Sequence, residues 1–322
     1  MKQKLHRICV GGFVITSLGV VVASLLALGA RLWWPLELLT HFPLQYIFLL
    51  VPVTLGLFVA KRRRLATVST VCLLWNLILI LPVYLLSSSK PNSGPESLRL
   101  MAVNVKTSNR RFDRFLEVVK TERPDVLVVL EVDNQWVDEL ARLRDDYPYS
   151  KTVPRQDNFG IALFSKRPLE VARVRYLGDA KVPSIEIQAR VNGRRLTILG
   201  THPLPPVGRN AARRNEQLAA IAKLVSNTKG PVVVAGDLNI TPWSPYFKDL
   251  LRQSGLRDSR RGFGFLASWP SRLGVLGIPI DHILVSPEVF VHRRWVAGET
   301  GSDHLPVVAD LLIGEGKDPA EP

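Results

Sequence analysis

Acidic and amide side chains come just after several short apolar runs of this sequence, at positions where strands would end. The set comprises Glu131, Asp237 with Asn239, Asp281, and Asp303 with His304. Carboxylates that several strand ends deliver into one cleft can hold a hard divalent cation against a phosphate group. The pattern therefore predicts phosphate chemistry, provided that the chain folds so that these residues meet.

The elements that would position them begin near residue 98. Short apolar runs typical of strands occur at residues 98–103, 126–130, 160–164, 171–176, 185–191, 196–199, 232–235, 278–285, 289–296 and 305–312. Apolar residues recur at helical spacing in residues 112–119 and 218–225, which predicts two amphipathic helices. Strands mixed with helices and with antiparallel turns such as Asn192-Gly193 predict an α/β fold, a two-sheet sandwich flanked by helices.

Three apolar segments precede this part, at about residues 8–30, 44–60 and 65–86. Each has about the 17 to 25 residues that a membrane-spanning helix needs, although the middle one contains Pro52. A buried helical hairpin is the alternative for any one segment, and the first is too long for a signal peptide's apolar region of about 7 to 15 residues. We predict an all-α transmembrane region of three helices over 1–89, a linker at 90–97, a catalytic domain over 98–313 and a tail at 314–322.

The basic residues predict how these helices are oriented, because Lys and Arg near helix ends stay on the cytoplasmic side. Basic residues precede the first segment and fill the turn at residues 61–64, whereas Arg31 and Glu37 balance each other in the first loop. Three crossings then place the catalytic domain outside the cell (inner) membrane, as part of a multi-pass protein. If the middle segment did not span, the orientation would be inverted.

Charge and cysteine content narrow the partners only partly. The formal net charge is +14 in 322 residues, of which residues 1–89 contribute 8 Lys and Arg and 1 acidic residue. A positive surface suits lipid headgroups, phosphorylated small molecules or nucleic acid alike. Both cysteines, Cys9 and Cys72, fall in the apolar segments, so we expect no disulfide-linked partner for the exported domain.

Six short motifs follow one another along the second part of the chain. They are Val103-Asn104, Val129-Leu130-Glu131, Gly200-Thr201-His202, Gly236-Asp237-Leu238-Asn239, Pro279-Ile280-Asp281-His282 and Ser302-Asp303-His304. With them, residues 98–313 resemble the endonuclease/exonuclease/phosphatase superfamily, which includes exonuclease III, DNase I, bacterial sphingomyelinases and inositol polyphosphate 5-phosphatases. The leading helices resemble a bacterial membrane-anchored branch. The resemblance implies a DNase I-like fold and hydrolysis of phosphoester bonds.

The resemblance also implies a metal site. Glu131 would be its main carboxylate, joined by Asn104 and Asp303. Hard oxygen ligands favour Mg²⁺, with Mn²⁺ as a possible substitute, because Mg²⁺ binds through one or two carboxylates and keeps its other positions for water and phosphate.

The catalytic roles come from the same resemblance. Asp237 would align and deprotonate the attacking water, and Asn239 would hydrogen-bond the phosphate. His304 would donate to the developing negative charge, with Asp281 behind it to orient and charge the ring. His202 would be a second histidine on the phosphate.

The roles of three further residues are inferred only from where they stand relative to these motifs. Lys106 stands where nucleases of the exonuclease III type carry an additional acid, so it removes a carboxylate from the metal's surroundings and offers a phosphate contact instead. This departure weakens any argument for abasic-site repair. Asn158 is either another phosphate contact or a turn residue, and His282 is expected to be structural.

The sequence thus predicts a membrane-anchored, Mg²⁺-dependent hydrolase acting on a lipid or small-molecule phosphoester or pyrophosphate. One alternative is a tethered extracytoplasmic nuclease, which would need a basic groove with aromatic platforms. The candidates for that groove are Arg209, Arg213, Arg214, Arg260, Arg261, Phe263 and Phe265. A second alternative is an inactive membrane protein that binds a phosphorylated ligand, but no carboxylate of the set is missing.

Overall fold

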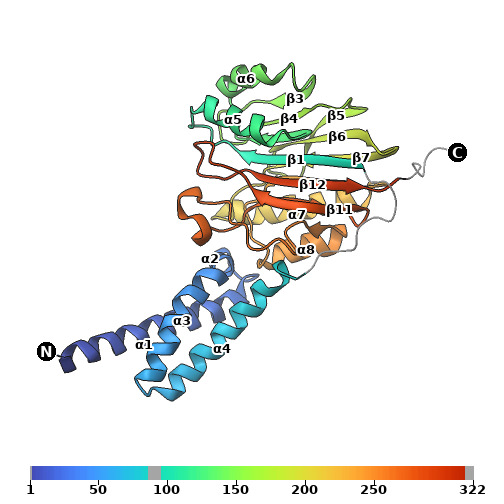
Figure 1. The fold of residues 1–322 in the computed structure, drawn as a ribbon. Coiled ribbons are helices and arrows are strands. Elements are labelled where there is room, and N and C mark those ends of the chain that lie inside the picture. Colours follow the sequence, from blue (N-terminus) through green and yellow to red (C-terminus); the bar gives the residue numbers. More distant parts are fainter. Residues whose placement is uncertain (1, 86–95, 316–322) are drawn as a thin grey trace.

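The computed structural model describes residues 2–85 and 96–315, which form a bundle of long helices and a two-sheet sandwich (Figure 1). Most of the predicted linker at 90–97 and of the predicted tail at 314–322 lies outside the described residues. The first strand of the sandwich begins at Glu96, two residues before the predicted start of the domain.

Each sheet of the sandwich has six strands. The first contains, in spatial order, β11 (Val289–Val296), β12 (Val307–Ile313), β1 (Glu96–Asn104), β2 (Val126–Leu130), β4 (Ile161–Ser165) and β3 (Tyr149–Val153). The second contains β5 (Val171–Tyr176), β6 (Pro183–Val191), β7 (Arg194–Gly200), β8 (Val232–Asp237), β10 (Asp281–Val285) and β9 (Arg257–Asp258). β1 pairs with β2 and β7 with β8 in parallel, and the other neighbours are antiparallel.

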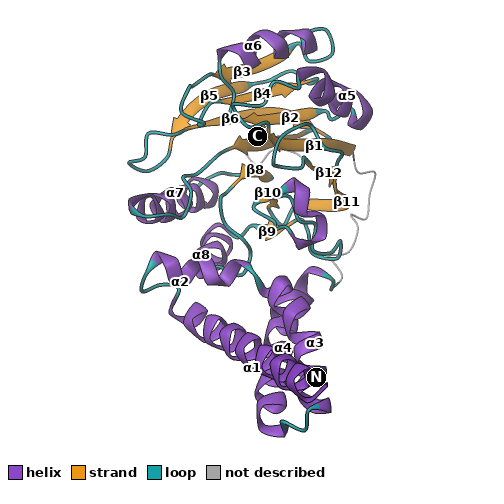
Figure 2. Cartoon of the chain, turned by 90° about the vertical axis from the view of Figure 1, so that its left-hand side faces the viewer, coloured by secondary structure: helices purple, strands orange, loops and turns teal. Residues whose placement is uncertain are grey.

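Burial of the central strands on both faces explains the continuous apolar runs of the sequence, whereas the outer strands β3 and β5 are partly exposed. Leu98, Leu100 and Ala102 of β1 belong to the core between the sheets. Met101 and Val103 point the other way, into the core that helices α5 (Phe112–Glu122) and α6 (Asn134–Leu140) cover. Helices α7 (Arg209–Ser226) and α8 (Pro245–Ser254) cover the outer face of the second sheet (Figure 2).

The predicted two-sheet sandwich flanked by helices is confirmed, and the predicted strands and both amphipathic helices lie where their patterns placed them. Strands β3 and β9 and helices α6 and α8 were not predicted. Both helices are short and begin at a side-chain cap: Asp133 accepts from Trp136 N, and Ser244 accepts from Tyr246 N. The seven residues of α6 are too few to show a clear apolar period, whereas α8 has one, at Phe247, Leu250 and Leu251, that the prediction overlooked.

The helical bundle consists of α1 (Lys2–Leu26), α3 (Pro43–Val59) and α4 (Arg63–Ile80), which lie beside one another (Figures 1 and 2). Among the described residues, Gln3–Gly29 and Arg63–Val83 are long and apolar enough to span a membrane. Trp34–His41 and Pro43–Val59, bent by 64°, give a third span if they are counted as one. The chain therefore has two or three candidate spans where the sequence predicted three.

A short bent segment joins α1 to α3 and contacts the sandwich. It consists of α2 (Trp34–Leu38), the 3-10 turn η2 (Leu39–His41) and Phe42, and we call it the junction segment. Glu37 is fully buried and pairs with the equally buried Arg214 of α7 at 2.6 Å. Arg31, just before the segment, pairs with Asp249 of α8 at 2.7 Å. The two charges expected to balance each other in this loop thus each pair with the catalytic domain.

An apolar cluster continues this contact at the end of α4. Ile80 and Val83 pack against Trp243 and Phe265 of the sandwich, and all four side chains are buried. Trp243 also donates through Nε1 to the Leu79 carbonyl at 3.0 Å. The bundle and the sandwich are therefore held together by both polar and apolar contacts.

Candidate active site

The strand register brings the predicted residues to one end of the sandwich. Asn104 ends β1 opposite Leu130, the last residue of the parallel strand β2, so Glu131 follows beside it. In the second sheet Asp237 ends β8 directly opposite Asp281, the first residue of β10. Parallel strands place their carboxyl ends at the same edge, and the antiparallel β10 starts there. The two sheets thereby deliver their polar ends to a common cleft.

Several residues of this cleft have left-handed backbone conformations. Glu131, Lys106, Asn158 and Asn239 all have φ between 51° and 66°. Gly236 has φ 146°, and a Cβ there would lie 2.0 Å from the Thr201 carbonyl oxygen. Non-glycine residues in such conformations cluster at functional sites, where the surrounding structure must hold them. The turn after each strand therefore directs the side chain that follows into the cleft.

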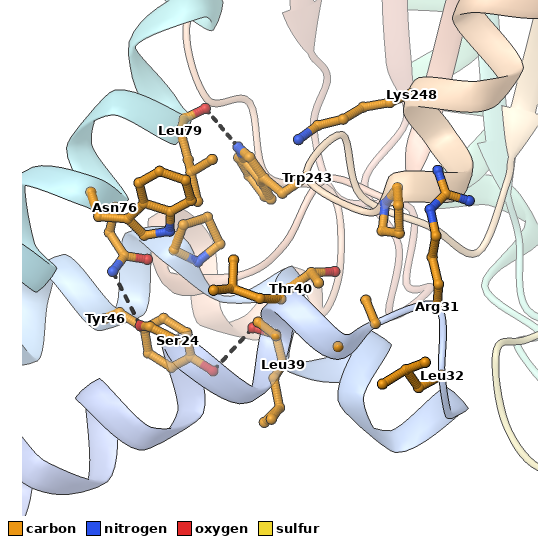
Figure 3. Close-up of a pocket in the computed structure, with 17 residues that line it drawn as sticks. Ser24, Arg31, Leu32, Leu39, Thr40, Tyr46, Asn76, Leu79, Trp243 and Lys248 are labelled. Atoms are coloured by element: carbon orange, nitrogen blue, oxygen red, sulfur yellow. Dashed lines mark hydrogen bonds between the residues drawn. The ribbon is translucent and has the colours of Figure 1, made fainter.

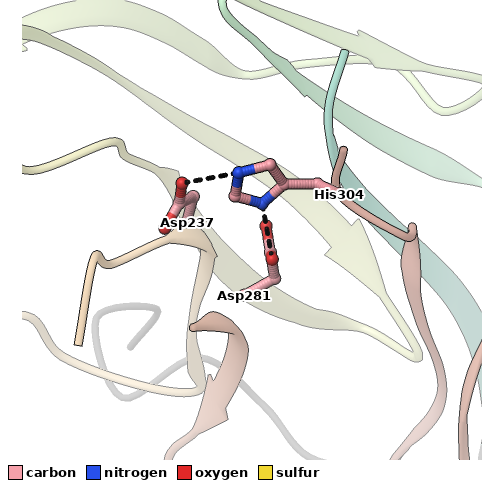
Figure 4. Close-up of side chains that lie close together, drawn as sticks. All are labelled: Asp237, Asp281 and His304. Atoms are coloured by element: carbon pink, nitrogen blue, oxygen red, sulfur yellow. Dashed lines mark hydrogen bonds and ion pairs between the residues drawn. The ribbon is translucent and has the colours of Figure 1, made fainter. Parts of the chain in front are cut away.

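His304 lies between two carboxylates at the centre of the site (Figure 4). Its Nδ1 is 2.9 Å from Asp281 Oδ2, and its Nε2 is 3.7 Å from Asp237 Oδ2. Burial by itself would lower the pKa of His304, but the Asp281 and Asp237 carboxylates outweigh it and raise this pKa to about 9. His304 is therefore a cation at neutral pH and can donate hydrogen bonds from both nitrogens.

Asp237 is fully buried and is surrounded by donors. Burial would raise its pKa, but His304 and His202 lower it to about 2. His202 Nε2 is 3.4 Å from Asp237 Oδ2. The backbone N–H of Asn239 donates to Asp237 Oδ1 at 2.8 Å. Asp237 is therefore ionised and fixed in orientation, as a group that positions a water molecule must be.

His202 and Asn239 lie beside each other, on the Asp237 side of the cleft. His202 Nε2 is 3.2 Å from Asn239 Nδ2, which also donates to the Pro203 carbonyl at 2.9 Å. Burial would lower the pKa of His202, but the hydrogen bond and charge of Asp237 raise it. Phe159 packs against the His202 ring, with centroids 5.1 Å apart. Asn158, which directly precedes Phe159, is exposed and lines the cleft.

Glu131 is half-buried on the floor of the cleft. The Asn104 amide donates to Glu131 Oε1 at 2.8 Å and to Asp237 Oδ2 at 3.2 Å, so it bridges the two carboxylates. Thr107 N donates to Glu131 Oε2 at 3.1 Å. Asn104 Oδ1 accepts from Lys106 N at 3.0 Å, and the role of Asn104 as a metal ligand stays a prediction.

Asp303, in the loop directly before His304, lines the cleft, and Lys106 Nζ contacts its Oδ2 at 3.1 Å. Ser302 fixes this loop, because its hydroxyl donates to the Asn104 carbonyl at 2.7 Å and accepts from His304 N at 3.1 Å. Lys106, which stands where an additional acid was expected for a nuclease of the exonuclease III type, therefore lines the cleft and pairs with Asp303, a predicted metal ligand.

Two groups of residues at this site could hold a metal ion. Ligand atoms of Asp237, Asp281 and His304 lie within 4.8 Å of one another, a spacing that could hold an ion. Both nitrogens of His304 face carboxylates, however, and a protonated imidazole has no lone pair for a metal. Glu131 and Asp303 line the cleft with hard oxygen atoms, and one or two carboxylates are what Mg²⁺ needs from a protein. The residues present therefore fit a divalent cation best at Glu131.

The cleft has a volume of about 770 Å³ and contains residues that the sequence did not indicate. Trp269 lies beside His304, with ring centroids 6.4 Å apart. The junction segment contributes Leu38, His41 and Phe42 to the lining. No spacing rule would connect a loop between apolar helices to a site some 200 residues later.

Three of the seven residues suggested for a basic groove are buried. Arg214 and Arg260 are buried in ion pairs with Glu37 and Asp258. Phe265 is buried and stacks on Trp243. These two guanidinium groups are internal structural cations, whereas Arg209, Arg213 and Arg261 are exposed, so a groove built from the remaining residues stays a prediction.

Comparison with known proteins agrees with this geometry. Residues 101–304 match the model of the endonuclease/exonuclease/phosphatase family, which covers well over half of the chain. The chain belongs to this family.

Three relatives illustrate the range of the endonuclease/exonuclease/phosphatase family. A phospholipase C of Staphylococcus aureus is 26% identical over 167 residues, 47% of this chain. The match spans about half of that relative, 48% of its length. The structure of TDP2 from D. rerio with a single-strand DNA product has a TM-score of 0.58 at 16% identity and covers 67% of this chain and 98% of that one. Sphingomyelinase C of Streptomyces griseocarneus has a TM-score of 0.51 at 20% identity and covers 66% and 99%. The two structures show the fold alone.

His282, the residue directly after Asp281, supports a prediction about stability. It is fully buried, and its Nε2 is 2.7 Å from the Ile240 carbonyl. Burial, aided by Arg260, lowers its pKa from 6.5 to about 4. The unfolded chain therefore binds this proton more readily between pH 6.5 and 4, so stability falls as pH falls through that window and this residue contributes no slope above it.

We expect His282 to account for up to about 3 kcal/mol of this loss. The measurement is unfolding of the detergent-solubilised protein between pH 4.5 and 7.5, with His282→Gln beside the parent. Gln can still donate to the Ile240 carbonyl but does not titrate, so its curve should be flatter than the parent's. Equal slopes for the two proteins would contradict the assignment.

Proposed function

We propose that this protein is a membrane-anchored, Mg²⁺-dependent phosphoesterase that hydrolyses a lipid or small-molecule phosphoester or pyrophosphate. The observation that carries the proposal is the Asp281–His304–Asp237 series, with distances of 2.9 and 3.7 Å, in the same cleft as Glu131. An ionised carboxylate beside two histidines with raised pKa values provides a base for water and donors for a phosphate at once.

The chain's own residues account for most of the chemistry. Asp237 holds the attacking water and accepts its proton while the bond from the water oxygen to phosphorus forms and the bond from phosphorus to the leaving oxygen breaks. His304, kept protonated by Asp281, donates to a phosphate oxygen, and His202 and Asn239 donate to others. Lys106 and Asn158 are the further phosphate contacts. In-line attack by water needs no covalent intermediate.

A divalent cation bound by Glu131, Asn104 and Asp303 would neutralise charge on the phosphate and on the leaving oxygen. Mg²⁺ is the expected ion and Mn²⁺ a substitute, since the donors are hard oxygen atoms.

The helical bundle supports the anchoring. Two or three helices are apolar enough to span a membrane. The basic turn at residues 61–64 lies at the end of the bundle away from the sandwich (Figure 1). Because basic ends stay in the cytoplasm, the catalytic domain would lie outside the inner membrane of the cell. A reporter fused after Pro322 tests this orientation, and a cytoplasmic signal would overturn it.

The fold relatives leave two candidate substrate classes. One relative is named a phospholipase C and one a sphingomyelinase C, whereas TDP2 was solved with a DNA product. The burial of Arg214 and Arg260 removes two of the cations that a nucleic-acid groove would use, so a tethered nuclease is the second candidate. Purified protein assayed on phospholipids, a polyprenyl pyrophosphate, a chromogenic phosphodiester and plasmid DNA separates the two.

Metal removal and the substitution Glu131→Gln should have parallel effects. We expect chelation to abolish hydrolysis, Mg²⁺ to restore it, and Glu131→Gln to lower kcat/KM at a fixed Mg²⁺ concentration by about 100-fold or more. Manganese binding followed by electron paramagnetic resonance should weaken in the same variant. Glu216→Gln, an exposed change on α7, is the matched control. Activity that survives chelation would exclude a metal-dependent mechanism, and inactivity of the parent on every substrate would favour a phospho-ligand-binding protein.

A further inference from the structure

The catalytic cleft has two chemically different sides. Its floor carries Glu131, Asp237 and the histidines, whereas Leu38 and Phe42 of the junction segment form an apolar side. Trp269, Ile278 and Ile280 continue this apolar surface from the sandwich. A phosphoester that is polar throughout would leave this surface without a partner, so the lining suits a ligand with an apolar part.

The apolar side belongs to the part of the chain that lies next to the bilayer. The junction segment connects the end of α1 to the start of α3, so its ends continue directly into candidate membrane spans. Its opposite side, with Leu39 and Thr40, lines a second cavity of about 410 Å³ among the ends of the helices (Figure 3). That cavity is lined mainly by apolar and aromatic residues of the 3-10 turn η1 (Ala27–Gly29) that follows α1, of α4 and of the start of α3, including Leu28, Tyr46 and Trp75. The junction segment therefore contributes to the lining of both the catalytic cleft and the cavity among the helix ends.

The junction segment is fixed to the catalytic loop that follows β8. Glu37 accepts from Arg214 and from the Ser244 hydroxyl at 2.6 and 2.7 Å, and Arg214 donates to the Asn239 carbonyl at 3.2 Å. His41 Nδ1 is 2.8 Å from the Thr241 hydroxyl, also in a buried position. Both ends of the loop from Asn239 to Ser244 are thus tied to the segment, which makes the apolar side a permanent wall of the cleft.

A second apolar feature lies at the same end of the cleft. The 3-10 segment η5 (Ser271–Leu276) follows Trp269 and exposes Leu273, Val275 and Leu276, with Val275 71% exposed. Gln45, in the first turn of α3, donates to the carbonyls of Leu276 and Gly277 at 2.7 and 3.0 Å. The exposed apolar tip is therefore held beside the start of a candidate span, where a lipid surface would cover it.

We propose that the substrate is a membrane lipid whose phosphoester sits on the polar floor while its hydrocarbon chain runs along Leu38 and Phe42 into the bilayer. The proposal rests on the phosphoesterase function proposed above and narrows its substrate class. Leu38 and Phe42 select the chain, and Glu37 and His41 position the segment that carries them. A soluble phosphoester would lose the contact with this wall.

The test uses a homologous series of alkyl p-nitrophenyl phosphates, from methyl to hexadecyl, in detergent micelles with Mg²⁺. All members share one leaving group and one reacting bond, so differences report on the chain alone. For the parent we expect kcat/KM to rise by at least about tenfold along the series, as the burial of a few methylene groups would give. In Leu38→Ser and Phe42→Ser the long-to-short ratio should approach one. Phe48→Ser, an exposed apolar position farther along α3, is the control and should keep the parent's ratio.

Inhibition by hexadecyl phosphate, compared with inhibition by methyl phosphate, measures binding without turnover. In Leu38→Ser and Phe42→Ser the inhibition should no longer depend on chain length. A parental ratio in both variants, or an equal loss in Phe48→Ser, would overturn the proposal. If one variant fails to fold, as judged from its thermal unfolding, the other decides. Failure of the proposed function looks different, because the parent would then release no nitrophenol from any member of the series.

Discussion

Replacement of Asp237 by Asn is expected to lower kcat/KM on the order of 10⁴-fold with little change in the fold. Asn is nearly isosteric and keeps an oxygen that can accept from Asn239 N. It cannot accept a proton from water, and it removes the negative charge that Asp237 presents to His202 and His304. The loss should appear mainly in kcat, measured on whichever substrate the parent hydrolyses fastest.

Asp179→Asn is the control for this experiment, because Asp179 is an exposed residue in the loop after β5, outside the cleft lining. Mg²⁺ binding by the Asp237→Asn variant should remain within a few-fold of the parent if Glu131 is the main ligand. Parental activity in Asp237→Asn would refute the assignment of the base. A complete loss of Mg²⁺ binding would instead place the cation at the group formed by Asp237, Asp281 and His304.

The second large effect is expected at Glu37, far from this site in the sequence. Glu37→Gln leaves the fully buried Arg214 without its counter-charge, and breaking one side of a buried ion pair costs about 3–5 kcal/mol. Thermal unfolding of the detergent-solubilised protein measures the effect. We also expect lower activity, since Arg214 donates to the Asn239 carbonyl.

Two companion variants make the Glu37 result specific. Arg31→Gln breaks the pair with Asp249, in which the Arg31 side chain is 54% exposed, and should cost at most about 1 kcal/mol. Replacement of both Glu37 and Arg214 by Met should recover much of the lost stability, because no unpaired charge remains. A Glu37→Gln protein as stable as the parent would mean that water reaches Arg214.

The sandwich could be predicted because its central strands are buried on both faces. Runs such as residues 126–130 and 232–235 are continuous in Val, Leu and Ala, and their ends coincide with β2 and with most of β8. The short helices that begin at the caps Asp133 and Ser244 were missed. The membrane spans were predicted from length and composition, which cannot show that α2 and α3 are bent by 64° relative to each other.

The candidate site was predictable where its residues lie at the ends of strands or directly after them. Asn104, Glu131, Asp237 and Asp281 were identified from motifs, and the register brings them together. Their individual contacts were not predictable, for example the Asn104 amide between two carboxylates or the pairing of Lys106 with Asp303. Such contacts depend on side-chain direction across two sheets, which no local pattern encodes. Their roles in catalysis remain predictions.

The junction segment lay outside any sequence argument because its importance comes from contacts with residues about 200 positions away. Only one signal was present: Glu37 and His41 are polar side chains in an otherwise apolar stretch. A charge in such a place must be paired, and its partner is most often in another element. That rule points to a partner without naming it.

The cluster of Ile80, Val83, Trp243 and Phe265 has a practical consequence for anyone who expresses the sandwich alone. A gene fragment that starts at Glu96 would lack half of the cluster and would leave Trp243 and Phe265, now only 6% and 7% exposed, facing water beside an unpaired Arg214. Such a fragment would tend to self-associate and would carry a loosened catalytic loop. Enzyme preparations from this chain should therefore retain the helices in a detergent or nanodisc, and inactivity of a truncated fragment should not be taken as evidence about the enzyme.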